Sequence, residues 1–133
     1  FSERDIFNRP VKYRDLSDVD FKADYIFSSH TLEHIPDLET IFNKMEIVLS
    51  NSGILIFHLP AYTCVRWRNG VHTNKKYNDH HWTFYLKEDE ESIKNLNLSN
   101  TLAIDEYVSQ FFEIDKASYC GDNSIIIFAK KKS

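Results

Sequence analysis

Residues 23–37 decide the fold, and they read Ala-Asp-Tyr-Ile-Phe-Ser-Ser-His-Thr-Leu-Glu-His-Ile-Pro-Asp. The first seven of these residues combine aromatic and β-branched side chains with two terminal serines, which predicts a β-strand. Pro36 and Asp37 then predict a helix start, because an N-cap aspartate accepts hydrogen bonds from the first helical amides. The apolar residues that follow recur at helical spacing: Leu38, Ile41, Phe42, Met45, Val48 and Leu49.

A nearly continuous apolar run at residues 54–59 predicts the next strand, and Pro60 ends it. The preceding Asn51, Ser52 and Gly53 are expected to stop the helix. Because the apolar run does not alternate, it predicts a strand buried on both faces, as in parallel sheets covered by helices. Strand, helix and strand in succession form a βαβ unit, so the sequence predicts an α/β fold.

The rest of the chain carries weaker patterns. Residues 61–85 form an irregular stretch rich in aromatic residues and histidines. Gly121, Asp122 and Asn123 predict the turn of an antiparallel hairpin. The further expected elements are a short strand at residues 11–14, helices at 87–96 and 104–112, and strands at 113–120 and 124–130.

Length and composition limit the class of protein. A chain of 133 residues with 42% hydrophobic residues predicts a single domain over residues 1–133. A net charge of −4 argues against a nucleic-acid partner, which would require a basic surface. No run approaches the ~18 apolar residues of a membrane span, so no membrane partner is expected. The two cysteines stand far apart, which predicts a reducing, cytoplasmic setting.

The glycines exclude one large group of nucleotide sites. Only Gly53, Gly70 and Gly121 occur, and no two of them are close in sequence. A glycine-rich phosphate loop of the GxGxxG or P-loop type is therefore absent from these 133 residues.

Residues 23–37 resemble the core motif of class I S-adenosylmethionine-dependent methyltransferases, in which a strand with an acidic and aromatic beginning leads into a Leu-Glu-His turn and a helix. Residues 49–56 resemble the family's next motif, a helix that ends in Leu-x-Pro-Gly-Gly before an apolar strand. Here Asn51 and Ser52 replace the Pro-Gly pair. The resemblance extends over nearly the whole chain and is specific at residues 23–60.

The resemblance implies a Rossmann-like sheet in the strand order 3-2-1-4-5-7-6, mostly parallel with a C-terminal antiparallel hairpin. Residues 11–14, 24–29 and 54–59 then correspond to strands 3, 4 and 5, and the hairpin supplies strands 6 and 7. Strands 1 and 2 and the glycine-rich cofactor loop have no counterpart. We therefore expect a partial methyltransferase domain that is inactive alone. The unpaired edge of strand 4 predicts a homodimer through this sheet edge.

The resemblance also implies where S-adenosylmethionine, the expected cofactor, would lie. Sites in such sheets form at the carboxyl ends of the strands. The residues assigned to the cofactor are Asp15, Leu16, Ser28, Ser29 and His30. His30 and His58 are the candidate catalytic residues, since an imidazole can take a proton from the acceptor. Each residue also has a structural alternative: Asp15 caps a turn, the serine hydroxyls satisfy a helix-entry turn, and His58 is a hydrogen-bonded core residue. Glu33 and His34 are interpreted as scaffold.

Residues 61–86 are expected to form a loop insertion on the substrate side of the domain. The candidate substrate-binding residues are Tyr62, Trp67, Arg68, His80 and His81. Arg66 or Arg68 could hold an anionic group of the acceptor, such as a phosphate. The alternative is a surface loop that its aromatic residues fasten to the core. A metal site built from His72, His80 and His81 is not expected, because adjacent histidines rarely face one ion and no carboxylate or cysteine spacing supports it.

The predicted function is S-adenosylmethionine-dependent methylation of an oxygen, nitrogen or carbon atom of a small-molecule acceptor. The alternative is a non-catalytic methyltransferase-like interaction domain that does not bind the cofactor and uses its exposed sheet edge as a partner surface. A nicotinamide-dinucleotide-binding domain is a third reading, which the missing glycine-rich loop disfavours.

Overall fold

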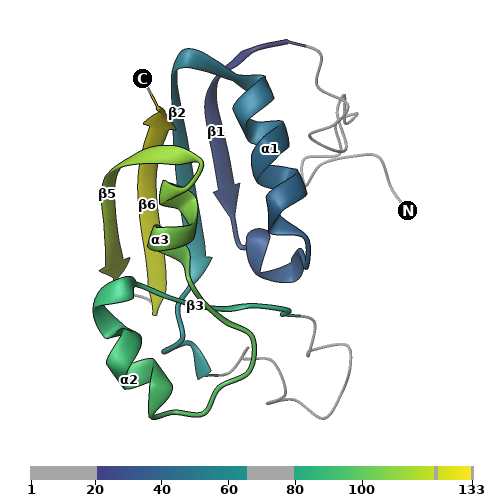
Figure 1. Cartoon of the computed structure of the whole chain (residues 1–133). Coiled ribbons are helices and arrows are strands. Elements are labelled where there is room, and N and C mark those ends of the chain that lie inside the picture. The colour runs from purple at the N-terminus through teal and green to yellow at the C-terminus, as the bar shows by residue number, and fades with distance from the viewer. Residues whose placement is uncertain (1–20, 66–79, 122, 133) are drawn as a thin grey trace, which may run out of the picture.

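A computed structural model describes residues 21–65, 80–121 and 123–132 of the chain. The elements in chain order are β1 (Ala23–Ser29), the 3₁₀ helix η2 (Leu32–His34), α1 (Leu38–Val48), β2 (Leu49–Pro60), β3 (Thr83–Tyr85), the 3₁₀ helix η5 (Lys87–Asp89), α2 (Glu90–Lys94), β4 (Thr101–Ala103), α3 (Ile104–Ser109), β5 (Phe112–Cys120) and β6 (Ser124–Lys131) (Figure 1). The predicted βαβ unit is confirmed, since β1 and β2 pair in parallel on either side of α1 in the sequence.

The main sheet has four strands in the order β1-β2-β6-β5. β1 pairs with β2 in parallel, whereas β6 runs antiparallel to both β2 and β5. This order agrees with the 4-5-7-6 half of the sheet that the resemblance implies, and the C-terminal hairpin is confirmed. Among the described residues, however, the sheet is mixed and not mostly parallel as predicted. Of its three strand pairings, only β1 with β2 is parallel, because β6 of the hairpin runs antiparallel to both of its neighbours. The expected strand at residues 11–14 lies outside the described residues.

A second, smaller sheet was not predicted. β3 and β4 pair in parallel, from Thr83 opposite Thr101 to Tyr85 opposite Ala103. Ala61 also makes an isolated parallel bridge to Phe84. β3 lies within the predicted loop insertion at residues 61–86. Three residues are too few to show a strand periodicity, so the sequence pattern could not reveal either strand.

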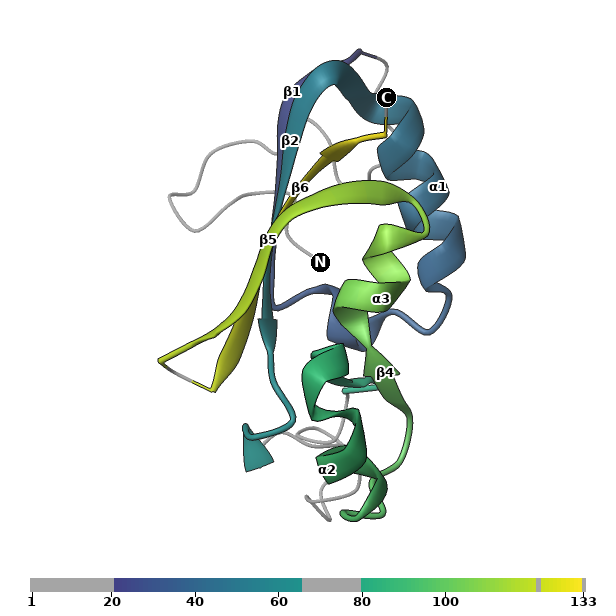
Figure 2. The same cartoon turned by 60° about the vertical axis from the view of Figure 1, so that its left-hand side comes forward.

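The helices α1 and α3 cover the same face of the main sheet, as the edge-on view shows (Figure 2). Leu55, Phe57 and Leu59 of β2 point into this core and are buried, whereas Ile56 and His58 between them are only partly buried. The prediction that residues 54–59 are buried on both faces is therefore wrong for the described part of the chain. Apolar side chains occupy both faces of the strand, but the described helices cover only one.

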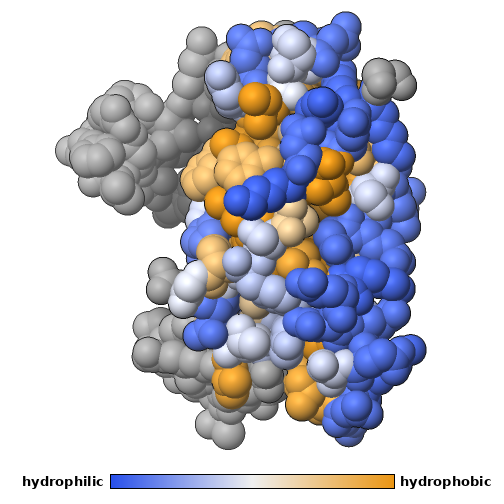
Figure 3. Space-filling view, turned by 90° about the vertical axis from the view of Figure 1, so that its left-hand side faces the viewer, coloured by the Kyte–Doolittle hydropathy of each residue, from blue (hydrophilic) through white to orange (hydrophobic). Residues whose placement is uncertain are grey.

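The face of the sheet that no described helix covers carries exposed aromatic side chains. Tyr25 and Phe27 of the edge strand β1 are 70% and 67% exposed, and Ile54 on β2 is 36% exposed. A space-filling view from the β5 side shows hydrophobic surface along the sheet and a mostly hydrophilic surface over the helices (Figure 3). The described part of the chain thus presents an apolar sheet face next to the edge of β1.

The turn from α1 into β2 is tighter than the sequence predicts. α1 ends at Val48, and Leu49 is already extended and begins β2, so Asn51 to Gly53 lie within the strand and do not stop the helix. Gly53 is buried, and a Cβ atom there would clash with the side chain of Leu49, whose Cγ would lie only 2.7 Å away. Gly53 is therefore needed for close packing between Leu49 and the strand backbone.

Asp37 caps α1 as predicted. Its Oδ1 accepts a hydrogen bond from the Thr40 backbone amide at 3.2 Å, and its Oδ2 accepts one from the Thr40 hydroxyl at 2.6 Å. Both bonds favour the carboxylate and hold the pKa of Asp37 below its ordinary value of 3.8. The cap thus stabilises the start of α1 most when Asp37 is ionised.

We predict that Asp37→Asn lowers the melting temperature at pH 7, and that this difference shrinks as the pH falls. A lowered folded-state pKa contributes stability that is present above the unfolded value near 3.8 and is lost as the pH falls through the folded value. Asparagine can still accept the backbone hydrogen bond but does not titrate. Calorimetry of both proteins between pH 7 and pH 3 measures this, and a difference independent of pH would contradict the assignment.

Candidate functional site

The carboxyl ends of β1 and β2 bring three of the predicted site residues together. Ser29 and His58 are register partners in the parallel pair, and Ser29 Oγ lies 3.1 Å from His58 Nδ1. The backbone amide of His30 donates to the carbonyl of His58 at 2.9 Å. The two imidazole rings meet edge to face, with centroids 4.8 Å apart. The sequence pattern placed these residues on the same sheet edge, and the parallel pairing makes them neighbours.

His30 has a backbone conformation that non-glycine residues rarely adopt, with a φ of 51°. This conformation turns the chain out of β1 toward η2. The side chain of His30 is 49% exposed, and its partial desolvation is the main cause that lowers its pKa; the neighbouring His58 and His34 lower this pKa further. The neutral imidazole, which can accept a proton, is therefore favoured at His30 near neutral pH.

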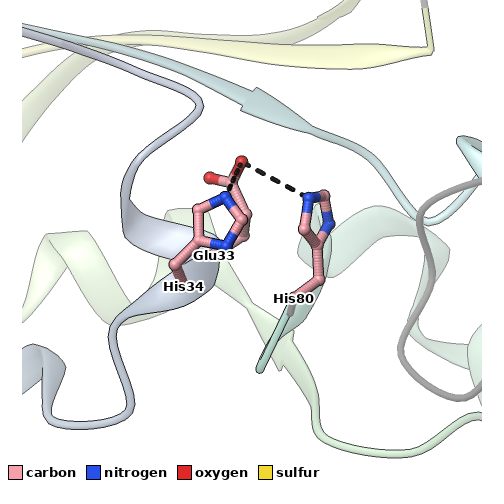
Figure 4. A group of neighbouring side chains, drawn as sticks. All are labelled: Glu33, His34 and His80. Carbon is pink, nitrogen blue, oxygen red and sulfur yellow. Dashed lines mark ion pairs between the residues drawn. The ribbon is translucent and has the colours of Figure 1, made fainter. Parts of the chain in front are cut away.

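A second group forms around the side chain of Glu33, which is 0% exposed. Three imidazoles approach the same carboxylate oxygen, Oε2: His34 Nε2 at 3.6 Å, His30 Nδ1 at 3.8 Å and His80 Nε2 at 3.9 Å. The donor atoms of Glu33, His34 and His80 all lie within 4.8 Å of one another. Figure 4 shows the imidazoles of His34 and His80, which come from different segments of the chain, converging on the Glu33 carboxylate.

Backbone hydrogen bonds hold the segment of His80 against η2. The amides of His81 and Trp82 both donate to the carbonyl of Glu33, at 2.7 and 3.0 Å. The indole Nε1 of Trp82 donates to the carbonyl of Ile35 at 2.8 Å. Residues distant in sequence are thus tied together by three hydrogen bonds, which set the position of His80 beside Glu33.

Tyr62 lies in a different place, at a pocket of about 180 Å³ beyond the end of β2. Its hydroxyl donates to Asp89 Oδ2 at 3.1 Å. Tyr119 in the same pocket accepts a hydrogen bond from the Leu86 amide at 2.9 Å, and burial is the main cause that raises the pKa of its phenol. The pocket is lined by Tyr62, Thr63, Asp89, Tyr119, Cys120, Gly121, Asn123 and Ser124.

The predicted site residues therefore divide into several groups. Ser28 and Ser29 end β1, and His30 and His58 adjoin them. His80 joins Glu33 and His34, whereas the ring of His81 packs on Trp82 with centroids 4.9 Å apart. The residues that fall outside the described part of the chain are Asp15, Leu16, Trp67 and Arg68.

The sequence pattern does not predict the grouping of Glu33 and His34 with His80. In the sequence, His80 is a candidate metal ligand only beside His72 and His81, with no carboxylate in suitable spacing. His72 lies outside the described residues. The carboxylate comes from Glu33, far earlier in the chain, and only the packing of residues 80–82 on η2 brings it to His80. The adjacent Glu33 and His34 were the available clue, since both are metal-ligand types.

The comparisons with known proteins agree with the fold. Residues 5–57 match a family model described as "Methyltransferase domain". The solved structure of the PH0226 protein from Pyrococcus horikoshii OT3 is similar, with a TM-score of 0.51 and 12% sequence identity over 85% of this chain. The match covers 56% of that chain, so the present chain spans little more than half of it. No curated protein matches the sequence significantly. Within the described ranges, no helix is both long and apolar enough to cross a membrane.

Proposed function

We propose that this chain, whose residues 5–57 match a methyltransferase-domain family model, acts in S-adenosylmethionine-dependent methyl transfer to a small-molecule acceptor. The observation that carries this proposal is the meeting of Ser29, His30 and His58 at the carboxyl ends of the parallel pair β1 and β2. This edge is where open α/β sheets bind their ligands.

The proposed chemistry is an in-line displacement. The acceptor atom forms a bond to the methyl carbon, the bond from that carbon to the sulfonium sulfur breaks, and the sulfur keeps the electron pair. A hydroxyl or amine acceptor also gives up a proton. The proposed base is His30, where the neutral imidazole is favoured, and the imidazole of His58 beside it is the second candidate. The rest of the catalysis is positioning of the two reactants.

The cofactor and the acceptor are assigned to different elements. We assign Ser28, Ser29 and His30 to the cofactor, together with Asp15 and Leu16, which the resemblance implies. We assign the acceptor to the stretch that follows β2, where Tyr62 lines the pocket of about 180 Å³ together with Tyr119 of β5. The predicted acceptor residues Trp67, Arg68, His80 and His81 come from the same stretch of the chain. The acidic chain, with a net charge of −4, supports a small molecule rather than a nucleic acid as acceptor.

We predict micromolar binding of S-adenosylmethionine and of its demethylated product, measured by calorimetry on the longest natural reading frame that contains this chain. The 133 residues alone, which carry no glycine-rich loop, are expected to bind much more weakly. Ser29→Leu should weaken binding at least about tenfold. The same change at Ser109, an exposed residue at the end of α3, is the matched control and should not. Absence of both heat and thermal shift with the long protein would overturn the proposal.

A second candidate function is favoured by the exposed aromatic residues of β1. In this alternative the chain is a non-catalytic interaction domain, and β1 pairs with the β1 edge of a second copy. Tyr25 and Phe27 on that edge strand are exposed in the described chain. A dimer in analytical ultracentrifugation that Phe27→Lys dissociates, combined with no cofactor binding, would favour this alternative. A dimer that binds the cofactor is compatible with the enzyme.

A further inference from the structure

We propose that Glu33, His34 and His80 form a binding site for one divalent transition-metal ion, such as zinc. The three donor atoms lie within 4.8 Å of one another, and they come from η2 and from the segment before β3. Metal binding at this site does not depend on the proposed methyl transfer. The two can therefore be tested separately on the same chain.

The donor set has the chemistry that such an ion requires. Two imidazole nitrogens and one carboxylate oxygen suit zinc and its first-row neighbours, whereas magnesium prefers oxygen ligands only. Metal bonds of ~2.0–2.2 Å place neighbouring ligands of a tetrahedral ion roughly 3.3–3.6 Å apart. The Glu33 oxygen lies 3.6 Å from His34 Nε2 and 3.9 Å from His80 Nε2. Small side-chain rotations would therefore close the site around an ion.

Charge also favours the ion. The Glu33 carboxylate is 0% exposed, and a buried carboxylate gains stability from a compensating positive charge. A dication bound to one carboxylate and two neutral imidazoles has a net charge of +1, so it compensates the carboxylate and still attracts an anionic fourth ligand. Three protein ligands leave a coordination position open, which is the arrangement of catalytic and not of structural zinc sites.

The scaffold holds the ligands in advance of metal binding. His80 is kept in place by the hydrogen bonds that its neighbours His81 and Trp82 donate to Glu33 and Ile35. His34 is fixed by its own amide, which donates to the Thr31 carbonyl at 3.1 Å. A backbone positioned in this way brings the ligands together before an ion binds, which reduces the cost of ordering the two segments and raises metal affinity.

The location suggests a use for the open position, and only this step rests on the proposed function. His30, which the resemblance places beside the transferred methyl, has its Nδ1 3.8 Å from the same Glu33 oxygen. A hydroxyl of the acceptor bound to the ion would have a lowered pKa. Its proton would pass to solvent, and the acceptor oxygen would then bond to the methyl carbon while the bond from that carbon to the sulfonium sulfur breaks and the sulfur keeps the electron pair. The acceptor class that this predicts is a hydroxyl compound.

The experiment is a titration of the chain, purified without a histidine tag and freed of metal by a chelator. Calorimetry with zinc alone should show one ion per chain. Cobalt alone should develop the visible absorption bands of a four- or five-coordinate site, which zinc should abolish by displacement. Magnesium at the same concentration should neither bind measurably nor compete.

Single substitutions test whether Glu33, His34 and His80 are the residues that bind the ion. His80→Ala and His34→Ala should each weaken zinc binding about 100-fold or more and remove the cobalt spectrum. Glu33→Gln should do the same, and circular dichroism would show whether that buried change also affects folding. His81→Ala is the matched control, because His81 is the adjacent histidine on the same segment and packs on Trp82; it should bind zinc as tightly as the unchanged chain.

Two results would overturn the metal site. One is no zinc binding by the folded chain. The other is zinc binding that His34→Ala and His80→Ala leave unchanged, or that His81→Ala weakens equally. Neither result bears on cofactor binding, which is measured without added metal. Conversely, a chain that binds zinc as predicted but never binds S-adenosylmethionine would retain the metal site and lose the proposed methyl transfer.

Discussion

Replacing Phe42 with alanine is expected to lower the free energy of unfolding by about 3–5 kcal/mol. Phe42 is 0% exposed and lies where α1 meets both the sheet and α3. Its ring centroid is 5.3 Å from those of Tyr107 and Phe111, 5.6 Å from that of Phe57 and 6.3 Å from that of Phe112. Truncation would leave a cavity between elements that cannot all close around it, so both the transfer energy and these ring contacts are lost.

Chemical denaturation followed by circular dichroism measures this loss. Ile47→Ala is the matched control, because Ile47 lies on the same helix but is 63% exposed. Its truncation should change the unfolding free energy by only about 0.5 kcal/mol. If the two variants lost similar stability, α1 would not pack on the sheet through the face that contains Phe42.

Replacing Ile127 with aspartate is expected to leave the chain largely unfolded at 25 °C. Ile127 lies in the interior strand β6, between Phe57 of β2 and Ala117 of β5, and is 0% exposed. An aspartate at this position must bury a charge or be protonated, which costs several kcal/mol in addition to the lost apolar contacts. A domain of this size has a total stability of only about 5–15 kcal/mol.

The neighbouring residue provides the control for this prediction. Ile126→Asp makes the same chemical change one position earlier, on the opposite face of β6, where the side chain is only partly buried. We expect this variant to remain folded with a lower melting temperature. Far-ultraviolet circular dichroism and gel filtration compare the two proteins. A folded Ile127→Asp variant beside an unfolded Ile126→Asp variant would show that the helices cover the other face of the sheet.

The elements that were predicted correctly depend on local physics. The strand before the Leu-Glu-His turn, the N-cap at Asp37 and the hairpin at Gly121 to Asn123 each follow from residues within a few positions of one another. The predicted helix stop at Asn51 to Gly53 is wrong. The local sequence favours a turn at these residues, but Leu49 is buried in the core as the first residue of β2, so the strand begins before them. Tertiary packing overrode a weak local preference.

The candidate site divides in the same way. Ser29, His30 and His58 could be expected to lie together, because the carboxyl ends of parallel strands share one edge of a sheet. The contact between Glu33 and His80 could not be predicted, because no periodicity or turn pattern links residues so far apart in the chain. Their meeting depends on the hydrogen bonds that His81 and Trp82 donate to the Glu33 carbonyl.

By itself, the sequence determined the βαβ unit, the C-terminal hairpin and the methyltransferase resemblance, because each is encoded by contiguous residues whose spacing matches a strand, a helix or a turn. Only the tertiary structure decided that one face of the sheet is covered, that β3 pairs with β4 and that Glu33 meets His34 and His80. These features arise from contacts between distant segments. The free energy of such contacts depends on which surfaces of distant segments are buried together. No single stretch of residues specifies which surfaces these are.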